Sequence, residues 1–277
     1  MTDKKDSLKS SVRKWLDTQG YPLEMRVAHQ FLEHNFDVFQ SEYYSDPESG
    51  EPREIDICAF LEADVGRSLA EFLFLIECKT TKDKPWILFT SNQTRYAIIP
   101  TDYSRVYRRI ASSMGEQLLL MLARSADIRN LPLFELPTPL AYGMAQAHAK
   151  NNYDTCYSAA MSATKAALAE VSTTSISSEA NVIRIAFPLI VIDGPLLEVR
   201  LDSNSNLELS EVQKGAIMWK MPKLSCPDMI IQVVTESALG QFCLDASTSI
   251  KSIIELCSTE LDAEIREAQK QMADRSP

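Results

Sequence analysis

The chain has 277 residues and a formal net charge of −10 at pH 7, with 45% hydrophobic and 24% charged residues. This composition is typical of an ordinary globular protein and excludes a disordered or collagen-like chain. No apolar stretch is long enough to span a membrane, so we expect no membrane partner. The N-terminal sequence MTDKKDSLKSSVRKW lacks the apolar core of a secretory signal, which predicts a cytoplasmic protein.

Two helices are predicted at the N-terminus, over 7–18 and 23–34. In the second helix Leu23, Val27 and Phe31 mark an apolar face, and Glu24 falls near the middle of that face. Burying a carboxylate there costs free energy unless a cation pairs with it, so we expect Glu24 to have a cationic partner. The alternative is that Glu24 interacts with the helix dipole from a solvated first turn.

Three strands are predicted next, over 36–44, 53–62 and 71–80. The link ADVGRSLA between the last two is short enough for an antiparallel hairpin. Both faces of the third strand are apolar as far as Glu77, which indicates a central strand covered on both sides.

Charged residues interrupt this predicted hairpin at two places. Glu77 and Lys79 share one face of the third strand because side chains alternate along a strand. Asp56 lies between Ile55 and Ile57, so it is expected to point away from that aliphatic pair. Antiparallel pairing can then bring Asp56 to the other two.

The rest of the chain mixes helices and strands around a Ser/Thr-rich segment, 172–180, which is the best internal boundary. It separates 1–171, which holds the hairpin, from a C-terminal extension of strands and helix, 172–277. That extension either continues the same sheet or forms a separate lobe. The predicted elements are helices over 104–125 and 152–171, strands over 181–192, 196–201, 212–221 and 229–234, and a helical region over 237–273.

Glu24, Asp56, Glu77 and Lys79 together suggest phosphodiester hydrolysis. That reaction needs a hard divalent cation to polarise the phosphate and activate a water molecule. Clustered carboxylates hold Mg²⁺ through oxygen and leave positions for water and substrate. An ammonium group on the same strand face positions that water or offsets charge that develops on phosphorus. The alternative for Glu77 and Lys79 is a structural surface pair.

At the segments EIDICAF and FLIECK, preceded by a helix with an acidic residue, the sequence resembles the PD-(D/E)XK nuclease superfamily. The resemblance covers roughly 20–100, with Ile rather than Pro before the aspartate. It implies a restriction-endonuclease-like α/β core with a mixed central sheet flanked by helices. It also implies that Asp56 and Glu77 bind Mg²⁺, for which Mn²⁺ can substitute. Lys79 would serve the attacking water, and Glu24 would assist at the metal.

A basic segment begins at Lys79. Between positions 79 and 109 there are seven basic residues and only two acidic ones, although the chain as a whole is acidic. The segment is either a solvated face or a nucleic-acid contact in which basic and aromatic side chains alternate. Gln93 and Tyr96 are candidates for an auxiliary pair, as in some members of the superfamily, or for loop packing. The candidate nucleic-acid contacts are Lys82, Lys84, Trp86, Arg95, Arg105, Arg108 and Arg109.

The sequence therefore predicts a Mg²⁺-dependent deoxyribonuclease, an endonuclease in defence against foreign DNA or in DNA repair. DNA is the expected partner, with a homodimer or a partner protein as further possibilities. The alternative is a catalytically inactive scaffold with the same fold that binds a protein or a nucleic acid. The acidic net charge favours this alternative, whereas the presence of all four chemical residues favours the nuclease.

Overall fold

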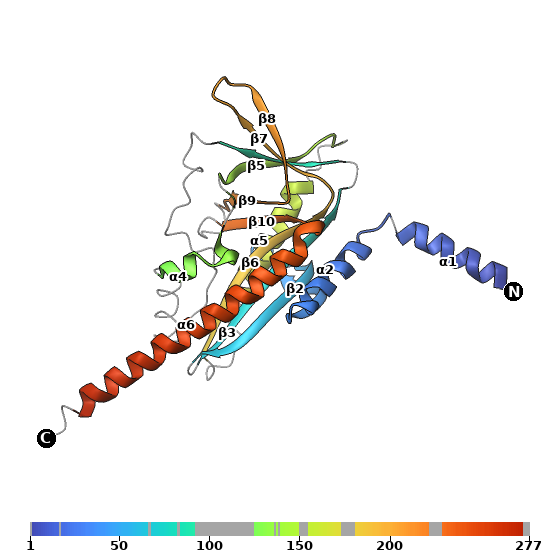
Figure 1. Ribbon diagram of the computed structural model, residues 1–277. Coiled ribbons are helices and arrows are strands. Elements are labelled where there is room, and N and C mark those ends of the chain that lie inside the picture. Colours follow the sequence, from blue (N-terminus) through green and yellow to red (C-terminus); the bar gives the residue numbers. More distant parts are fainter. Residues whose placement is uncertain are drawn as a thin grey trace.

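A mixed β-sheet with helices on both faces organises the chain (Figure 1). The computed structural model describes residues 2–16, 18–65, 68–81, 84–91, 125–135, 137, 139–149, 155–172, 181–221 and 229–273. Ten strands are assigned within these residues: β1 (Asp37–Ser45), β2 (Pro52–Val65), β3 (Ser68–Thr80), β4 (Trp86–Thr90), β5 (Ala141–Gln146), β6 (Asn181–Asp193), β7 (Leu196–Leu201), β8 (Leu207–Val212), β9 (Lys214–Trp219) and β10 (Met229–Thr235).

The helices of the described residues differ greatly in length. They are α1 (Thr2–Leu16), α2 (Tyr21–Glu33), α4 (Ala126–Arg129), α5 (Thr155–Ser172) and α6 (Leu239–Ala273), with short 3₁₀ turns η2 (Pro132–Phe134) and η4 (Glu236–Ala238). None of them is long and apolar enough to cross a membrane. The coarse prediction of an α/β fold with a mixed sheet flanked by helices is confirmed.

Strands from both ends of the chain alternate within the sheet. The order is β1-β2-β3-β6-β10-β9-β5-β4-β7-β8. The strands β1, β2 and β3 form an antiparallel meander, and β6 pairs with β3 in parallel along its whole length. β10 then pairs with β6, also in parallel. Of the two alternatives for the C-terminal region, the structure therefore shows the first, an extension of the same sheet.

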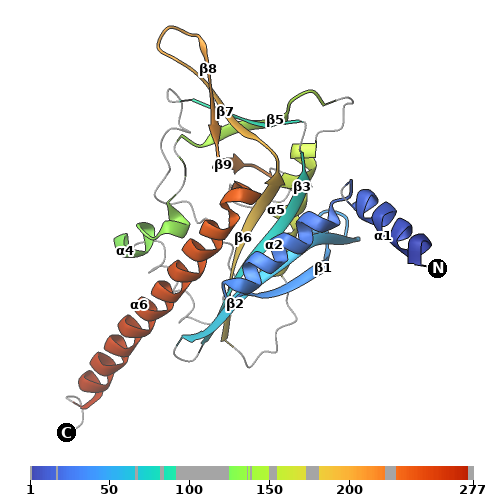
Figure 2. The same cartoon turned by 45° about the vertical axis from the view of Figure 1, so that its right-hand side comes forward.

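The helices cover the two faces of the sheet unequally. Figures 1 and 2 show α2 and α6 on one face of β3 and β6, and α5 on the opposite face. Successive residues of β3 follow this division, because Phe74 and Ile76 pack with α2 and α6 whereas Leu73 and Leu75 pack with α5. The strand is buried on both faces, as its apolar sequence predicts.

The sequence explains how α2 ends and β1 begins. Asn35 adopts a left-handed conformation with φ of 67°, which Asn tolerates better than most residues. The backbone N–H of Asn35 donates to Leu32 and that of Phe36 donates to Phe31, the pattern of a Schellman C-cap. The ring centroids of Phe31 and Phe36 lie 5.1 Å apart, and this contact fixes the end of α2 against the start of β1.

The predicted elements differ from the structure mainly at their boundaries. The two N-terminal helices and the hairpin of β2 and β3 are present. The strand predicted over 212–221 is instead two strands, β8 and β9, which separate at Gln213. The helix predicted over 104–125 lies outside the described residues except for Ser125, whose hydroxyl caps α4.

Candidate active site

The candidate site lies where β2 and β3 stop pairing. Their antiparallel pairing ends with Ile57 opposite Ile76. Beyond this pair β3 continues beside β6 as far as Thr80. Asp56 is therefore at the point where the two strands of the hairpin separate, and among the described residues the end of β3 pairs only with β6.

The regular alternation of side chains between the two faces of β2 is broken at Asp56. Ile57 packs in the core under α2, whereas Ile55 packs in the core under α5. Opposite Asp56, between regular pairs on either side, Ser41 of β1 adopts a left-handed conformation with φ of 54°. The prediction that Ile55 and Ile57 share a face is therefore wrong, and the break in alternation lies opposite this irregular residue.

The Asp56 carboxylate takes the place of a strand partner. Its Oδ2 atom accepts a hydrogen bond of 2.7 Å from the backbone N–H of Cys78 in β3. A buried backbone N–H without an acceptor costs about 1 to 3 kcal/mol, so this contact stabilises the open end of the hairpin. It also places a negative charge beside Glu77 and Lys79.

The carboxylates of Asp56 and Glu77 both lie near the ammonium group of Lys79. The Lys79 Nζ atom lies 2.5 Å from Glu77 Oε2 and 3.8 Å from Asp56 Oδ2. The Glu77 side chain is only 6% exposed and that of Lys79 is 25% exposed. Two carboxylates from separate strands therefore converge on the Lys79 ammonium group.

The electrostatics of this group follow from burial and mutual contact. Burial raises the pKa of Glu77 and the charge of Asp56 adds to the rise, while Lys79 opposes it. Burial acts to lower the pKa of Lys79, but the charges of Glu77 and Asp56 outweigh it and raise that pKa. The lysine is therefore held as a cation beside two acidic groups that are short of hydration.

Glu24 lies within electrostatic reach of the group but not in contact with it. Burial raises the pKa of Glu24, the charge of Asp56 raises it further, and Lys79 opposes the rise. No hydrogen bond or ion pair within the described residues joins Glu24 to Asp56, Glu77 or Lys79. The side chain is half-buried in the first turn of α2, so both interpretations of its position retain support.

The donor atoms suit a hard divalent cation with a partly aqueous shell. Asp56 and Glu77 supply carboxylate oxygens, and Mg²⁺ in proteins is often held by one or two carboxylates with water and substrate phosphate completing the shell. Within the described residues no group of three or more Asp, Glu, His or Cys side chains is close enough to form a complete metal cage. Two carboxylates would therefore supply part of the shell, and water and substrate would have to complete it.

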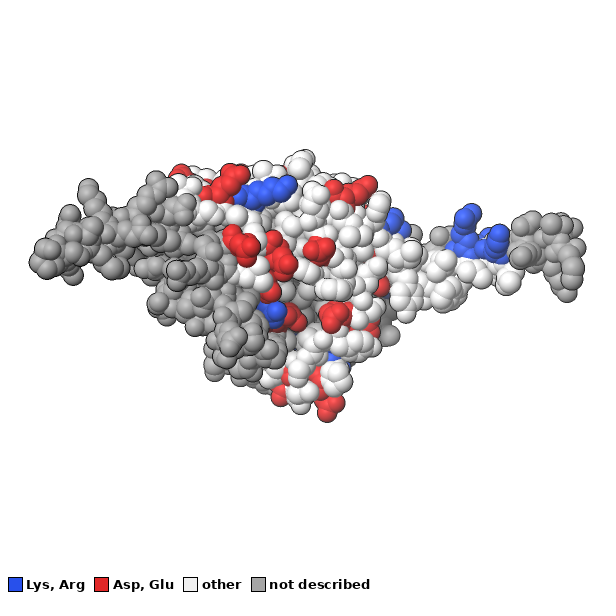
Figure 3. All heavy atoms as spheres, turned by 90° about the horizontal axis from the view of Figure 1, so that it is seen from below, with Lys and Arg blue, Asp and Glu red and all other residues white. Residues whose placement is uncertain are grey.

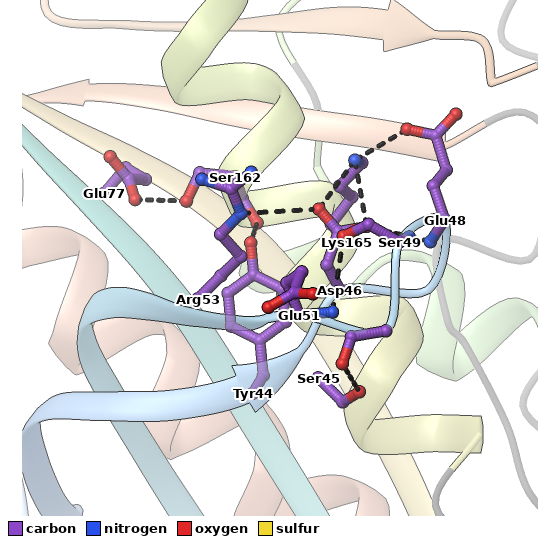
Figure 4. Close-up of polar contacts among 11 residues, drawn as sticks. Tyr44, Ser45, Asp46, Glu48, Ser49, Glu51, Arg53, Glu77, Ser162 and Lys165 are labelled. Atoms are coloured by element: carbon purple, nitrogen blue, oxygen red, sulfur yellow. Dashed lines mark hydrogen bonds and ion pairs between the residues drawn. The ribbon is translucent and has the colours of Figure 1, made fainter.

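The helix α5 supports the site from the face on which Glu77 lies. Figure 4 shows Ser162 of α5 next to Glu77, with Tyr44 and the turn after β1 on its other side. The Ser162 hydroxyl donates to Glu77 Oε1 at 2.5 Å, and Lys165 forms an ion pair with the buried carboxylate of Asp46. Nothing in the local sequence points to these residues, because it does not show which strand an Ala-rich helix will cover.

The predicted nucleic-acid contacts are largely beyond the described residues. Trp86 is fully buried in the core between the sheet and α5, so its ring does not stack on a base and that prediction is wrong. Lys84 is half-buried in the turn after β3, where its backbone N–H donates to Thr81. The residues outside the described part are Lys82, Gln93, Arg95, Tyr96, Arg105, Arg108 and Arg109.

The surface of the described residues is predominantly acidic. Figure 3 shows a face on which Asp and Glu side chains gather, whereas the projecting helix α1 carries basic ones. A shallow hollow of about 500 Å³ lies beyond the end of β6 and includes Asp193, Glu211 and Glu236 in its lining. Its lining includes none of Glu24, Asp56, Glu77 and Lys79.

Comparison of the chain with family models, with curated proteins and with solved structures gave no match.

Proposed function

We propose that this chain is a metal-dependent nuclease that hydrolyses DNA phosphodiester bonds. The observation that carries the proposal is the convergence of the Asp56 and Glu77 carboxylates on the Lys79 ammonium at the end of a buried strand. Such a group of desolvated acids around one cation costs stability, and sites of this kind are common where chemistry takes place. The resemblance to the PD-(D/E)XK superfamily supports the same interpretation.

Each residue would have a separate role. Asp56 and Glu77 would hold Mg²⁺ or Mn²⁺, and Glu24 would assist from the end of α2. The bound cation would polarise the phosphate and lower the pKa of an attacking water. Lys79 would orient that water through its ammonium group and offset the negative charge that develops on phosphorus. The pairing of β2 with β3 ends before Glu77, so a substrate phosphate would approach the carboxylates from the β2 side.

DNA as substrate, and an endonucleolytic role in defence or repair, rest on the resemblance. An acidic protein needs a local basic surface to approach DNA. Within the described residues α1 offers exposed Lys9, Arg13 and Lys14. The candidate basic contacts that follow Lys79 in the sequence would add to them.

Cleavage assays with matched variants test the proposal. The purified chain is incubated with supercoiled, linear and single-stranded DNA and with RNA, with and without Mg²⁺ or Mn²⁺. We expect cleavage of DNA that requires the metal and that falls about 1000-fold or more in Asp56→Asn, Glu77→Gln and Lys79→Met. Glu71→Gln is the control, because Glu71 is a carboxylate on the same strand whose ion pair with Arg184 lies at the far end.

The competing function is a scaffold without catalytic activity. The close Glu77–Lys79 ion pair and the acidic surface favour it, because a closed ion pair is also a common structural feature. Undiminished cleavage in all three variants, or folded wild-type protein that cleaves none of the four nucleic acids with either metal, would overturn the nuclease. The second result would leave the scaffold as the better interpretation.

A further inference from the structure

The two oxygens of the Glu77 carboxylate have different partners. Oε2 receives the Lys79 ammonium from the same strand, whereas Oε1 receives the Ser162 hydroxyl from α5, each at 2.5 Å. A single ion pair leaves a carboxylate free to rotate about its last bond. Contacts to both oxygens, from two different elements, fix the plane of the group.

Ser162 is a polar exception on a helix face made for close packing. Its neighbours Ala159, Ala160, Ala163 and Ala166 are all fully buried, which allows α5 to approach the sheet closely. A serine inside a helix usually turns its hydroxyl to solvent or to the carbonyl one turn earlier. The Ser162 hydroxyl instead bonds a side chain 85 residues away in sequence.

A second set of contacts fixes α5 against the hairpin of β1 and β2. The Lys165 Nζ atom lies 2.8 Å from Asp46 Oδ2 and 2.6 Å from Glu48 Oε2. The hydroxyl of Tyr44, which is buried, donates to the carbonyl of Ser162 at 3.4 Å. Figure 4 shows Ser162 between Glu77 on one side and Tyr44 with the Lys165 contacts on the other, so the part of α5 that holds Glu77 is itself attached to the hairpin.

We propose that Ser162 is a positioning residue for the metal site, which holds Oε1 of the Glu77 carboxylate and thereby fixes the orientation of that group. This inference rests on the proposed function, because it assigns the carboxylate to a metal. A hydrogen bond from a neighbouring residue orients a metal-binding carboxylate and tunes its affinity, and its loss typically weakens binding about 10- to 100-fold. Ser162 would not touch the substrate or the metal.

Metal binding measured without any nucleic acid tests the inference. Mn²⁺ is titrated into wild-type protein, Ser162→Ala and Ser162→Thr by calorimetry, with the number of bound ions checked by electron paramagnetic resonance. We expect Ser162→Ala to weaken the affinity by about tenfold or more and Ser162→Thr, which keeps a hydroxyl, to retain most of it. The matched control is Thr164→Val, which removes a buried hydroxyl without a hydrogen-bond partner from the same helix.

The outcomes separate this inference from the proposed function. Equal Mn²⁺ affinity in wild-type protein and Ser162→Ala, whatever the change in melting temperature, overturns the positioning role and leaves the nuclease proposal standing. Mn²⁺ binding that is weakened in Ser162→Ala, in a protein that cleaves no nucleic acid, supports the positioning role and rejects the nuclease. Wild-type protein that binds no Mn²⁺ overturns both.

Discussion

Asp56 Oδ2 accepts a hydrogen bond of 2.7 Å from the backbone N–H of Cys78, at the point where β2 ceases to pair with β3. One carboxylate therefore completes the hairpin and contributes charge to the candidate site. These two duties depend on different properties of the side chain, since any acceptor oxygen satisfies the N–H but only an anion attracts a cation. They can therefore be separated by substitution.

Asp56→Asn and Asp56→Ala are expected to differ in stability but not in activity. Both remove the charge and should abolish cleavage. Asn retains an oxygen that can accept from Cys78, whereas Ala leaves that N–H without its acceptor, at a cost of about 1 to 3 kcal/mol. Urea unfolding curves measure the difference, and equal stability of the two variants would show that the hydrogen bond contributes nothing.

Lys79→Met alone should destabilise the fold more than the double variant that carries both Lys79→Met and Glu77→Gln. Methionine leaves the nearly buried Glu77 carboxylate beside Asp56 without its cation, which costs about 3 kcal/mol for a buried ion pair that loses one partner. Replacing Glu77 by Gln as well removes the stranded charge and should recover most of that loss. Chemical unfolding of the wild-type protein, both single variants and the double variant forms a double-mutant cycle. If the losses of unfolding free energy in the two single variants add up to that of the double variant, the two side chains are not coupled.

Asp46 predicts a pH-dependent contribution to stability. Burial acts to raise the pKa of Asp46, but hydrogen bonds from Lys165 and from two backbone N–H groups outweigh it and hold that pKa below its ordinary value. A lowered folded-state pKa stabilises the protein above the ordinary pKa of about 3.9, and the contribution is lost as pH falls through the folded value. Asp46→Asn should therefore cost about 2 kcal/mol at pH 7 and much less near pH 3.

Measurement of the unfolding free energy of both proteins across this pH range checks the prediction. The exposed Glu51→Gln, in the same turn, is the control and should show no such dependence. A loss in Asp46→Asn that is the same at pH 7 and pH 3 would show that the Lys165 contact is not the cause.

Gly194 is predicted to tolerate no side chain. It follows β6 in the turn to β7, and a Cβ atom there would lie 2.2 Å from Thr81 Oγ1 and 3.0 Å from its backbone carbon. Thr81 follows directly after β3, so Gly194→Ala should shift the end of the strand that carries Lys79 and destabilise the protein by about 1 to 3 kcal/mol. Gly143→Ala, where the nearest atom lies at 3.6 Å, should leave the melting temperature nearly unchanged.

The parts of the site that alternate along one strand were predictable from the sequence. Glu77 and Lys79 share a face because they are two residues apart in a strand, and the short link predicts the hairpin that brings Asp56 near them. The exchange of faces between Ile55 and Ile57 was not predictable, because the local sequence alternates regularly there and the only irregular backbone among the described residues of β1 is that of Ser41, opposite Asp56.

Long-range placement explains the other differences. Trp86 looks like an exposed aromatic residue in a basic segment, but β4 pairs with β5 and β7 inside the sheet and buries the ring. Ser162 has no local signal at all, because its partner is decided by where α5 packs. Local sequence reports periodicity within an element, whereas these contacts depend on which elements become neighbours.

During translation, the hairpin of β2 and β3 leaves the ribosome well before the strand that completes it. Glu71 and Arg184, which face each other across β3 and β6, are 113 residues apart in the chain. Until β6 is made, one edge of an apolar strand is bare, and such an edge is prone to aggregation and a natural substrate for chaperones. The group of Asp56, Glu77 and Lys79 would therefore acquire its packed surroundings only after most of the chain had been synthesised.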